Sequence, residues 1–173
     1  MKTKYSLIFF FLCLISCKEE SPELKQKIYF EKHYVNNAWL PQSYGFLIDS
    51  LGNVLEFKWV EVSHIWYDPD SDGYVSSANM DKNISFCRVI NYHINPDTLK
   101  LYIDEIYKAS KGVISDPILV MADAGSTTYS AFIFDKNTNL YKQVVIKTVG
   151  DILITNSTPE SEQIYLWLRR IDN

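Results

Sequence analysis

The sequence has too few cysteines and too little positive charge for several common classes of protein. Of its three cysteines, Cys13 and Cys17 lie in or directly after the first apolar segment, which leaves Cys87 without a partner for a disulfide framework. Lysine and arginine number 17 against 21 aspartates and glutamates, a formal charge of −4. Because binding to phosphates requires clustered positive charge, this composition argues against nucleic acid as a partner.

The sequence also lacks the common motifs of enzymes and metal sites. It contains no nucleophile elbow, no phosphate-binding loop and no HExxH pattern. His33, His64 and His93 do not have the spacing of zinc ligands. Motifs alone therefore assign no catalytic class.

The apolar run near the N-terminus is too short to span a bilayer, which takes about 20 apolar residues. Lys2 and Lys4 precede the run at residues 7–15, an arrangement typical of a secretory signal peptide. The end of this run and the two residues after it, Leu14-Ile15-Ser16-Cys17, resemble the lipobox of bacterial lipoproteins. This resemblance implies that residues 1–16 are removed, and that Cys17 becomes the acylated first residue, carrying palmitate-type chains that anchor the protein in a membrane.

The residues after Cys17 predict a more specific location. Lys18-Glu19-Glu20 resembles the export tag of surface lipoproteins in Bacteroidetes-type bacteria, and residue 18 is not the aspartate that favours retention in the inner membrane. The resemblance implies the outer membrane, and its outer face. Without residues 1–16 the chain has 15 basic and 21 acidic residues, a formal charge of −6. The acyl chains, rather than a basic patch, are therefore expected to hold it at the membrane.

The rest of the chain predicts a tether at residues 17–26 and a single globular domain at residues 27–173. Two hairpins are expected, because turn-forming residues at 50–53 and 136–139 each separate two apolar or alternating segments. Three helices are expected, beginning at Ser77, at Asn95 with Pro96, and at Ser157 or Thr158. Strands and helices do not strictly alternate, so the class is α+β, with a mainly antiparallel sheet built from two hairpins and an amphipathic C-terminal helix packed on it. Additional strands are expected at residues 28–35, 118–121 and 152–155.

The most unusual segment lies at residues 68–79, where Asp68, Asp70 and Asp72 alternate ahead of Gly73. Carboxylates this close repel one another, and a bound cation relieves that repulsion. Their positions resemble the start of an EF-hand calcium loop, whose oxygen ligands suit Ca²⁺. This resemblance predicts a calcium site that stabilises the fold.

Three further residues complete the resemblance or depart from it. Tyr74 would supply a backbone carbonyl, Ser76 would bind through water, and Asn79 occupies the twelfth place of the loop. An EF-hand has a bidentate glutamate at that twelfth place and a helix before the loop, but the segment before Asp68 is strand-like. The resemblance therefore implies half of the usual unit and weak binding.

Three functions remain open on the sequence alone. The first is a non-enzymatic module that binds a protein or a glycan. The second is a hydrolase of envelope or extracellular polymers that uses acids from Asp68 to Asp72 or Asp123, and the third is an inhibitor or immunity-type lipoprotein. A concave pocket with convergent acids of shifted pKa would favour the hydrolase, whereas an exposed aromatic patch would favour binding.

Overall fold

A computed structural model describes residues 25–38, 41–59 and 66–171. The predicted signal peptide and Cys17 lie outside these residues, as do Trp39 and His64. The strands are β1 (Ile28–Asn36), β2 (Gln42–Asp49), β3 (Asn53–Trp59), β4 (Tyr74–Ser76), β5 (Arg88–His93), β6 (Ile118–Leu119), β7 (Ser126–Asp135), β8 (Leu140–Gly150) and β9 (Ile152–Thr155), and the helices are α1 (Ser77–Ser85), α2 (Pro96–Ala109) and α3 (Pro159–Leu168). Within the described part of the chain, no helix is both long and apolar enough to cross a membrane.

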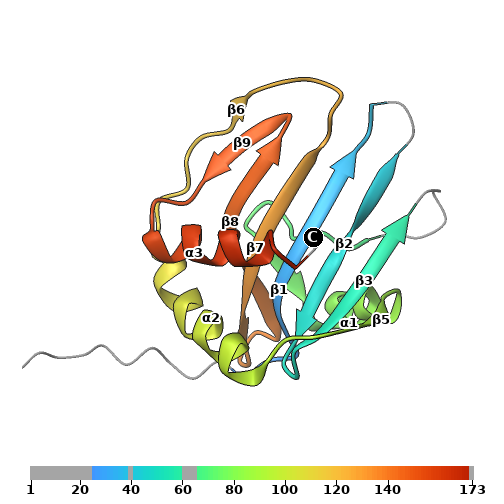
Figure 1. Ribbon diagram of the computed structural model, residues 1–173, viewed down its shortest axis with the longest axis vertical. Helices are drawn as coiled ribbons and strands as arrows, with labels where there is room; N and C mark the ends of the chain where they lie inside the picture. The colour runs from blue at the N-terminus through green and yellow to red at the C-terminus, as the bar shows by residue number, and fades with distance from the viewer. Residues whose placement is uncertain (1–24, 39–40, 60–65, 172–173) are drawn as a thin grey trace, which may run out of the picture.

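The strands form one large twisted sheet, and every strand pair in the described residues is antiparallel (Figure 1). The order is β5-β3-β2-β1-β7-β8-β9-β6, and β4 pairs with β8 off this path. The α+β class and both predicted hairpins are confirmed. The sheet is nevertheless larger than two hairpins, because β1 pairs with both β2 and β7 and so joins the two halves. Pairing between segments about a hundred residues apart leaves no local pattern in a sequence.

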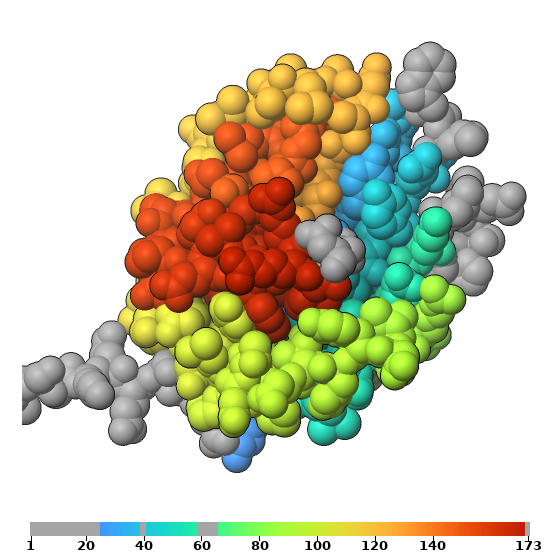
Figure 2. Space-filling model, viewed as in Figure 1, coloured from blue at the N-terminus to red at the C-terminus, as the bar shows by residue number. Residues whose placement is uncertain are grey.

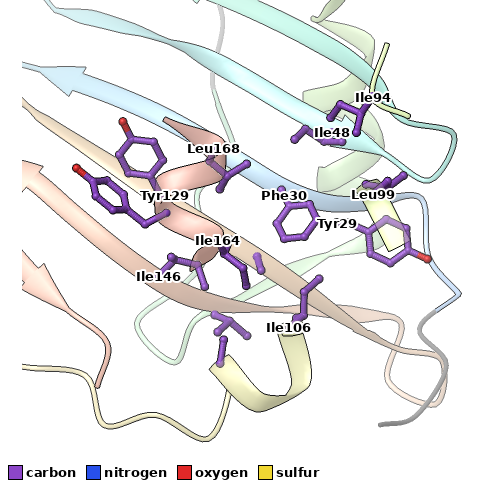
Figure 3. Close-up of a cluster of buried hydrophobic side chains, with 14 of the residues drawn as sticks. Tyr29, Phe30, Ile48, Ile94, Leu99, Ile106, Tyr129, Ile146, Ile164 and Leu168 are labelled. Carbon is purple, nitrogen blue, oxygen red and sulfur yellow. The ribbon is translucent and has the colours of Figure 1, made fainter. Parts of the chain in front are cut away.

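One face of the sheet is covered by α2 and α3 (Figure 1). Ile106 of α2 and Ile164 and Leu168 of α3 are fully buried against Phe30 of β1 (Figure 3). Trp167 adds an aromatic contact, since its ring lies edge-on to Phe30 with 5.0 Å between centroids. The C-terminal helix therefore packs on the sheet, as its stripe of apolar residues predicts.

The opposite face carries α1 and the loop that precedes β4. Met80 of α1 and Val75 of β4 pack against Leu47 and Phe132 of the sheet. Asn83 of α1 is 2% exposed and holds the loop, because its side chain accepts from the backbone N–H of Tyr67 and donates to the Tyr67 carbonyl, each at 3.0 Å. The sheet is thus the middle of three layers.

The helix starts follow local capping chemistry. Asn95 caps α2 ahead of Pro96, as predicted, and Thr158, one of the two predicted positions, caps α3 ahead of Pro159. For α1 the cap is Ser76, one residue before the predicted Ser77. Strands β4 and β5 were not predicted, because three and six residues in polar surroundings give little periodic signal.

The packed domain also includes a residue that the sequence places in the tether. Gln26 is buried, and its amide donates to the carbonyls of Ile28 and Phe132 at 2.6 Å. Its side-chain oxygen accepts from the N–H of Phe134 at 2.8 Å. Gln26 therefore links the start of β1 to β7.

Candidate functional site

The acidic loop is a tight turn organised by Asp70. Its Oδ1 accepts hydrogen bonds from the backbone N–H groups of Asp72, at 3.0 Å, and Tyr74, at 2.9 Å. Gly73 takes a positive φ of 81°, which glycine adopts without strain. One predicted calcium ligand therefore already satisfies backbone donors of the turn.

Two other predicted ligands also have structural roles. The Tyr74 carbonyl accepts from the N–H of Asp70 at 2.8 Å, and the Ser76 hydroxyl caps α1 by accepting from the N–H of Asn79 at 3.1 Å. Across residues 25–38, 41–59 and 66–171, no three His, Cys, Asp or Glu side chains gather as a metal-binding group. Calcium binding stays a prediction.

Asp68, the first residue of the loop, contacts the sheet. Its Oδ1 lies 3.5 Å from Nδ1 of His33, on β1. On the other side of the imidazole, Nε2 of His33 lies 2.7 Å from the hydroxyl oxygen of Ser43, on β2. The three side chains are therefore aligned as Ser43, His33 and Asp68, with the histidine in the middle.

The position of the His33 ring depends on a glycine in the next strand. In the sheet register His33 is opposite Gly45, which is opposite Phe57. A Cβ atom on Gly45 would meet the carbonyl oxygen of Lys32, so the strands approach too closely for a side chain there. Over this glycine the rings of His33 and Phe57 meet edge-on at 5.3 Å, and Trp66 stacks on Phe57 at 3.9 Å. These rings restrict the access of water to His33.

Burial determines the protonation of this cluster. Desolvation lowers the pKa of His33 to about 4, so its ring is neutral at physiological pH. Glu31, on the same face of β1, is 4% exposed; burial, with the nearby charge of Asp68 as a second cause, raises its pKa to about 8. Burial, followed by the effect of Glu31, raises the pKa of Cys87 to about 12, which leaves an unreactive thiol. Burial also raises the pKa of Asp68, although two-thirds of its side-chain surface remains exposed.

A neutral imidazole beside a hydroxyl can act as a general base. The arrangement of Ser43, His33 and Asp68 was not foreseen from the sequence, which indicated only Asp68. The available signal was the pair Glu31 and His33, two polar residues on one side of a strand that is otherwise aromatic and β-branched.

A second candidate site lies on the opposite face of the same strands. It is a groove of about 920 Å³ between β2, β3, β5 and the segment that follows α3. In Figure 2 these segments meet where the cyan and green atoms approach the red end of the chain. Twelve residues line it: Gln42, Tyr44, Gly45, Phe46, Val54, Glu56, Phe57, Lys58, Phe86, Arg88, Ile90 and Ile171.

The groove combines an aromatic ring with charged groups. Tyr44 is 39% exposed and lies opposite Lys58 in the sheet register. Glu56, two residues before Lys58, accepts from Nε and Nη2 of Arg88 at 3.0 and 2.6 Å. The sequence predicted that Glu56 and Lys58 share one face of β3, but not that β5 would bring Arg88 beside them.

The remaining acid proposed for a hydrolase lies elsewhere. Asp123 stands in the turn before β7, where its carbonyl accepts from the side-chain amide of Asn36 at 3.2 Å. The turn is held by Asp151, which accepts from the N–H groups of Ala124 and Gly125 at 2.9 Å. Among the described residues, no contact joins Asp123 to Asp68.

Comparisons with known proteins give no relative. No protein-family description, no curated protein and no solved structure matches the chain.

Proposed function

We propose that this chain is a lipoprotein of the outer membrane, anchored through acylated Cys17 and exposed on the outer face, whose domain binds a protein or glycan partner. The groove lined by Tyr44, Lys58 and Arg88 is the observation that carries the binding function. Its volume lies within the range of about 300–1,000 Å³ that is common for binding pockets. The N-terminal resemblance supports the anchor and the location.

The surroundings of the groove support recognition of a partner. Helices α2 and α3 cover one part of this sheet face (Figure 1). The groove lies beyond the end of α3, where Ile171 lines it. An exposed aromatic ring beside charged groups supplies contact area and directional hydrogen bonds together, as in many recognition surfaces. Tyr44, Lys58 and Arg88 provide these elements.

Site-specific photo-crosslinking tests this function. A photoreactive residue at position 44 is compared with one at Leu51, which is 70% exposed in the turn between β2 and β3. In cells of a Bacteroidetes-type bacterium, we expect a defined protein or glycan adduct at position 44, and its loss when Phe46 at the groove floor is replaced by alanine. Equal adducts at positions 44 and 51, or none at 44, would contradict the proposal.

A hydrolase is the second candidate, and the hydrogen bond between Ser43 and His33 favours it. In such a reaction the Ser43 oxygen attacks an ester carbonyl carbon while its proton passes to Nε2 of His33. The alcohol leaves with that proton, and water then hydrolyses the acyl-serine to an acid and the free hydroxyl. Asp68 would keep the imidazole oriented through Nδ1.

A fluorophosphonate probe, which labels activated serines, tests this candidate. Labelling of the wild type that is lost in Ser43→Ala and His33→Gln, and kept in Ser85→Ala, would support it. Ser85 is an exposed matched control at the end of α1. An unlabelled wild type would contradict it.

A further inference from the structure

We propose that the partner of the groove is a carboxylated glycan, in which one sugar carboxylate meets Lys58 while hydroxyls meet Glu56. This inference rests on the proposed binding function and adds the chemical class of the ligand. It follows from the charge, the hydrogen-bonding capacity and the aromatic surface of the groove.

The charge of the groove is opposite to that of the chain as a whole. The charged residues of its lining are Lys58, Arg88 and Glu56, a net charge of +1, whereas the full chain carries −4. Arg88 is paired with Glu56. Lys58 is exposed and has no carboxylate within ion-pair distance in the described residues. A local excess of positive charge on an acidic protein favours an anionic ligand.

Glu56 limits which anions are suitable. Both hydrogen bonds from Arg88 end on Oε2, so Oε1 keeps its capacity to accept. A ligand that presented only anionic oxygens, such as a polyphosphate, would face repulsion from this carboxylate. A ligand that also carries hydroxyl donors turns Oε1 into a favourable contact.

Tyr44 supplies a flat apolar surface at the same place. Its ring lies opposite Lys58 on the neighbouring strand, where directly opposed side chains are about 5 Å apart at Cβ. The ring is further held by Tyr34, with 4.5 Å between centroids, and the side-chain amide of Gln42 lines the groove two residues away. A sugar ring offers an apolar face to the aromatic ring and vicinal hydroxyls to the amide and carboxylate groups.

An acidic peptide is the main alternative, and the lining favours it less. Phe46 on the groove floor is 3% exposed, so it offers little apolar surface to a buried anchor residue. Binding energy in peptide interfaces usually concentrates in such buried anchors. The exposed residues of the lining, Gln42, Tyr44, Lys58 and Arg88, are polar or aromatic and suit a ligand rich in hydroxyls, while Phe86, Ile90 and Ile171 are partly exposed and add apolar surface.

Calorimetry with matched ligands tests the inference. The purified full chain is titrated with tetramers of galacturonate, mannuronate and glucuronate, with the methyl ester of each, and with hexaglutamate. Esterification removes the charge and keeps the sugar. We expect at least one acid tetramer to bind about tenfold more tightly than its ester, and Lys58→Met to abolish that difference.

Matched variants separate the possible outcomes. Lys136→Met, in the exposed turn between β7 and β8, should keep wild-type affinity, whereas Tyr44→Ala should weaken both acid and ester. Equal binding of acid and ester that still depends on Tyr44 overturns the carboxylate inference and leaves the proposed function standing. Tighter binding of hexaglutamate overturns the glycan class in favour of a protein partner. Absence of binding to every probe overturns the inference, while crosslinking at position 44 reports separately on the proposed function.

Discussion

His33 and Ser43 are joined by a hydrogen bond of 2.7 Å between Nε2 and Oγ, beneath the aromatic ring of Trp66. Because burial lowers the pKa of His33 to about 4, the imidazole is neutral at physiological pH and is a weaker base than a free histidine. Glu31 lies two residues away and stays protonated up to about pH 8. The sheet thus holds two neutral ionisable groups side by side, with opposite consequences for stability against pH.

Glu31 should make the protein less stable as the pH rises. Unfolded, the carboxyl loses its proton near pH 4.5, whereas in the fold it keeps the proton to about pH 8, so folded protein binds more protons in between. Above pH 6.5, where the histidine no longer contributes, the free energy of unfolding should fall by about 1.4 kcal/mol per pH unit up to pH 8. Urea unfolding from pH 5 to 9 measures this slope.

Glu31→Gln, which mimics the protonated acid, should remove the decline between pH 6.5 and 8 and leave the variant more stable than wild type at pH 8. Glu160→Gln, in the first turn of α3, is the matched control and should keep the wild-type slope. A wild type whose stability does not change over this range would refute a buried, protonated Glu31.

His33 should have the reverse effect in acid. The unfolded ring gains a proton below about pH 6.5, while the folded ring resists protonation down to about pH 4, so stability should be lost as the pH falls between these values. Between pH 4.5 and 6.5 this loss and the gain from Glu31 should nearly cancel. In Glu31→Gln the histidine effect should therefore appear alone, as a steady fall in the urea midpoint on acidification. A flat acid profile in that variant would contradict the neutral histidine.

Asn83→Ala should release the loop from α1. The substitution leaves the N–H and the carbonyl of Tyr67 without their partner, and we expect a cost of about 2–4 kcal/mol in the free energy of unfolding. Asn137→Ala, in an exposed turn, should change it by less than about 0.5 kcal/mol. Equal effects of the two substitutions would show that the hydrogen bonds between Asn83 and Tyr67 contribute little to the stability of the fold.

Calcium should raise the melting temperature if the loop at Asp68 binds it. With an affinity of about 10⁻⁴–10⁻³ M, 5 mM Ca²⁺ should increase the melting temperature by about 3–8 °C relative to chelator. Asp72→Asn should reduce the shift, because the Asp72 side chain is exposed and makes no hydrogen bond to other residues in the described part of the chain, which leaves its carboxylate free for Ca²⁺. Asp116→Asn, an exposed acid between α2 and β6, should keep it. No shift in the wild type at millimolar Ca²⁺ would end the calcium interpretation.

Cys17→Ser should abolish acylation. In cells fed an alkyne analogue of palmitate, wild type and Cys87→Ser should both carry the label. Cys87 is not expected to be acylated, because it packs against the hydrophobic core and its thiol donates to the carbonyl of Asn83 in α1. Cys17→Ser should carry none and should be released from the outer membrane. Label that persists on Cys17→Ser would refute the lipobox prediction.

The elements that depend on neighbouring residues were predictable from the sequence. Asn95 with Pro96 and Thr158 with Pro159 define helix starts, because a cap and a proline act on backbone groups within one turn. The two hairpins follow equally from their turns. The predicted cap of α1, Ser77, was one residue too late, because Ser76 and Ser77 are both suitable caps and only the hydrogen bond from the N–H of Asn79 to Ser76 distinguishes them.

The candidate sites depended on the tertiary structure. The sequence indicated Asp68 as part of a pattern that resembles a calcium loop. Its contact with His33 arises only because the hydrogen bond from the N–H of Tyr67 to Asn83 holds this loop against the sheet. Likewise Lys58 meets Arg88 in one groove only because β5 adds to the edge of β3.

The sequence by itself determined the capped helices and the hairpins, and it predicts an anchor at Cys17, because each depends on residues within a few positions of one another. The tertiary structure decided the large sheet, the neutral pair of Glu31 and His33, and the groove at Tyr44. Each of these comes from strand pairing over long separations and from burial, and neither is expressed in local spacing.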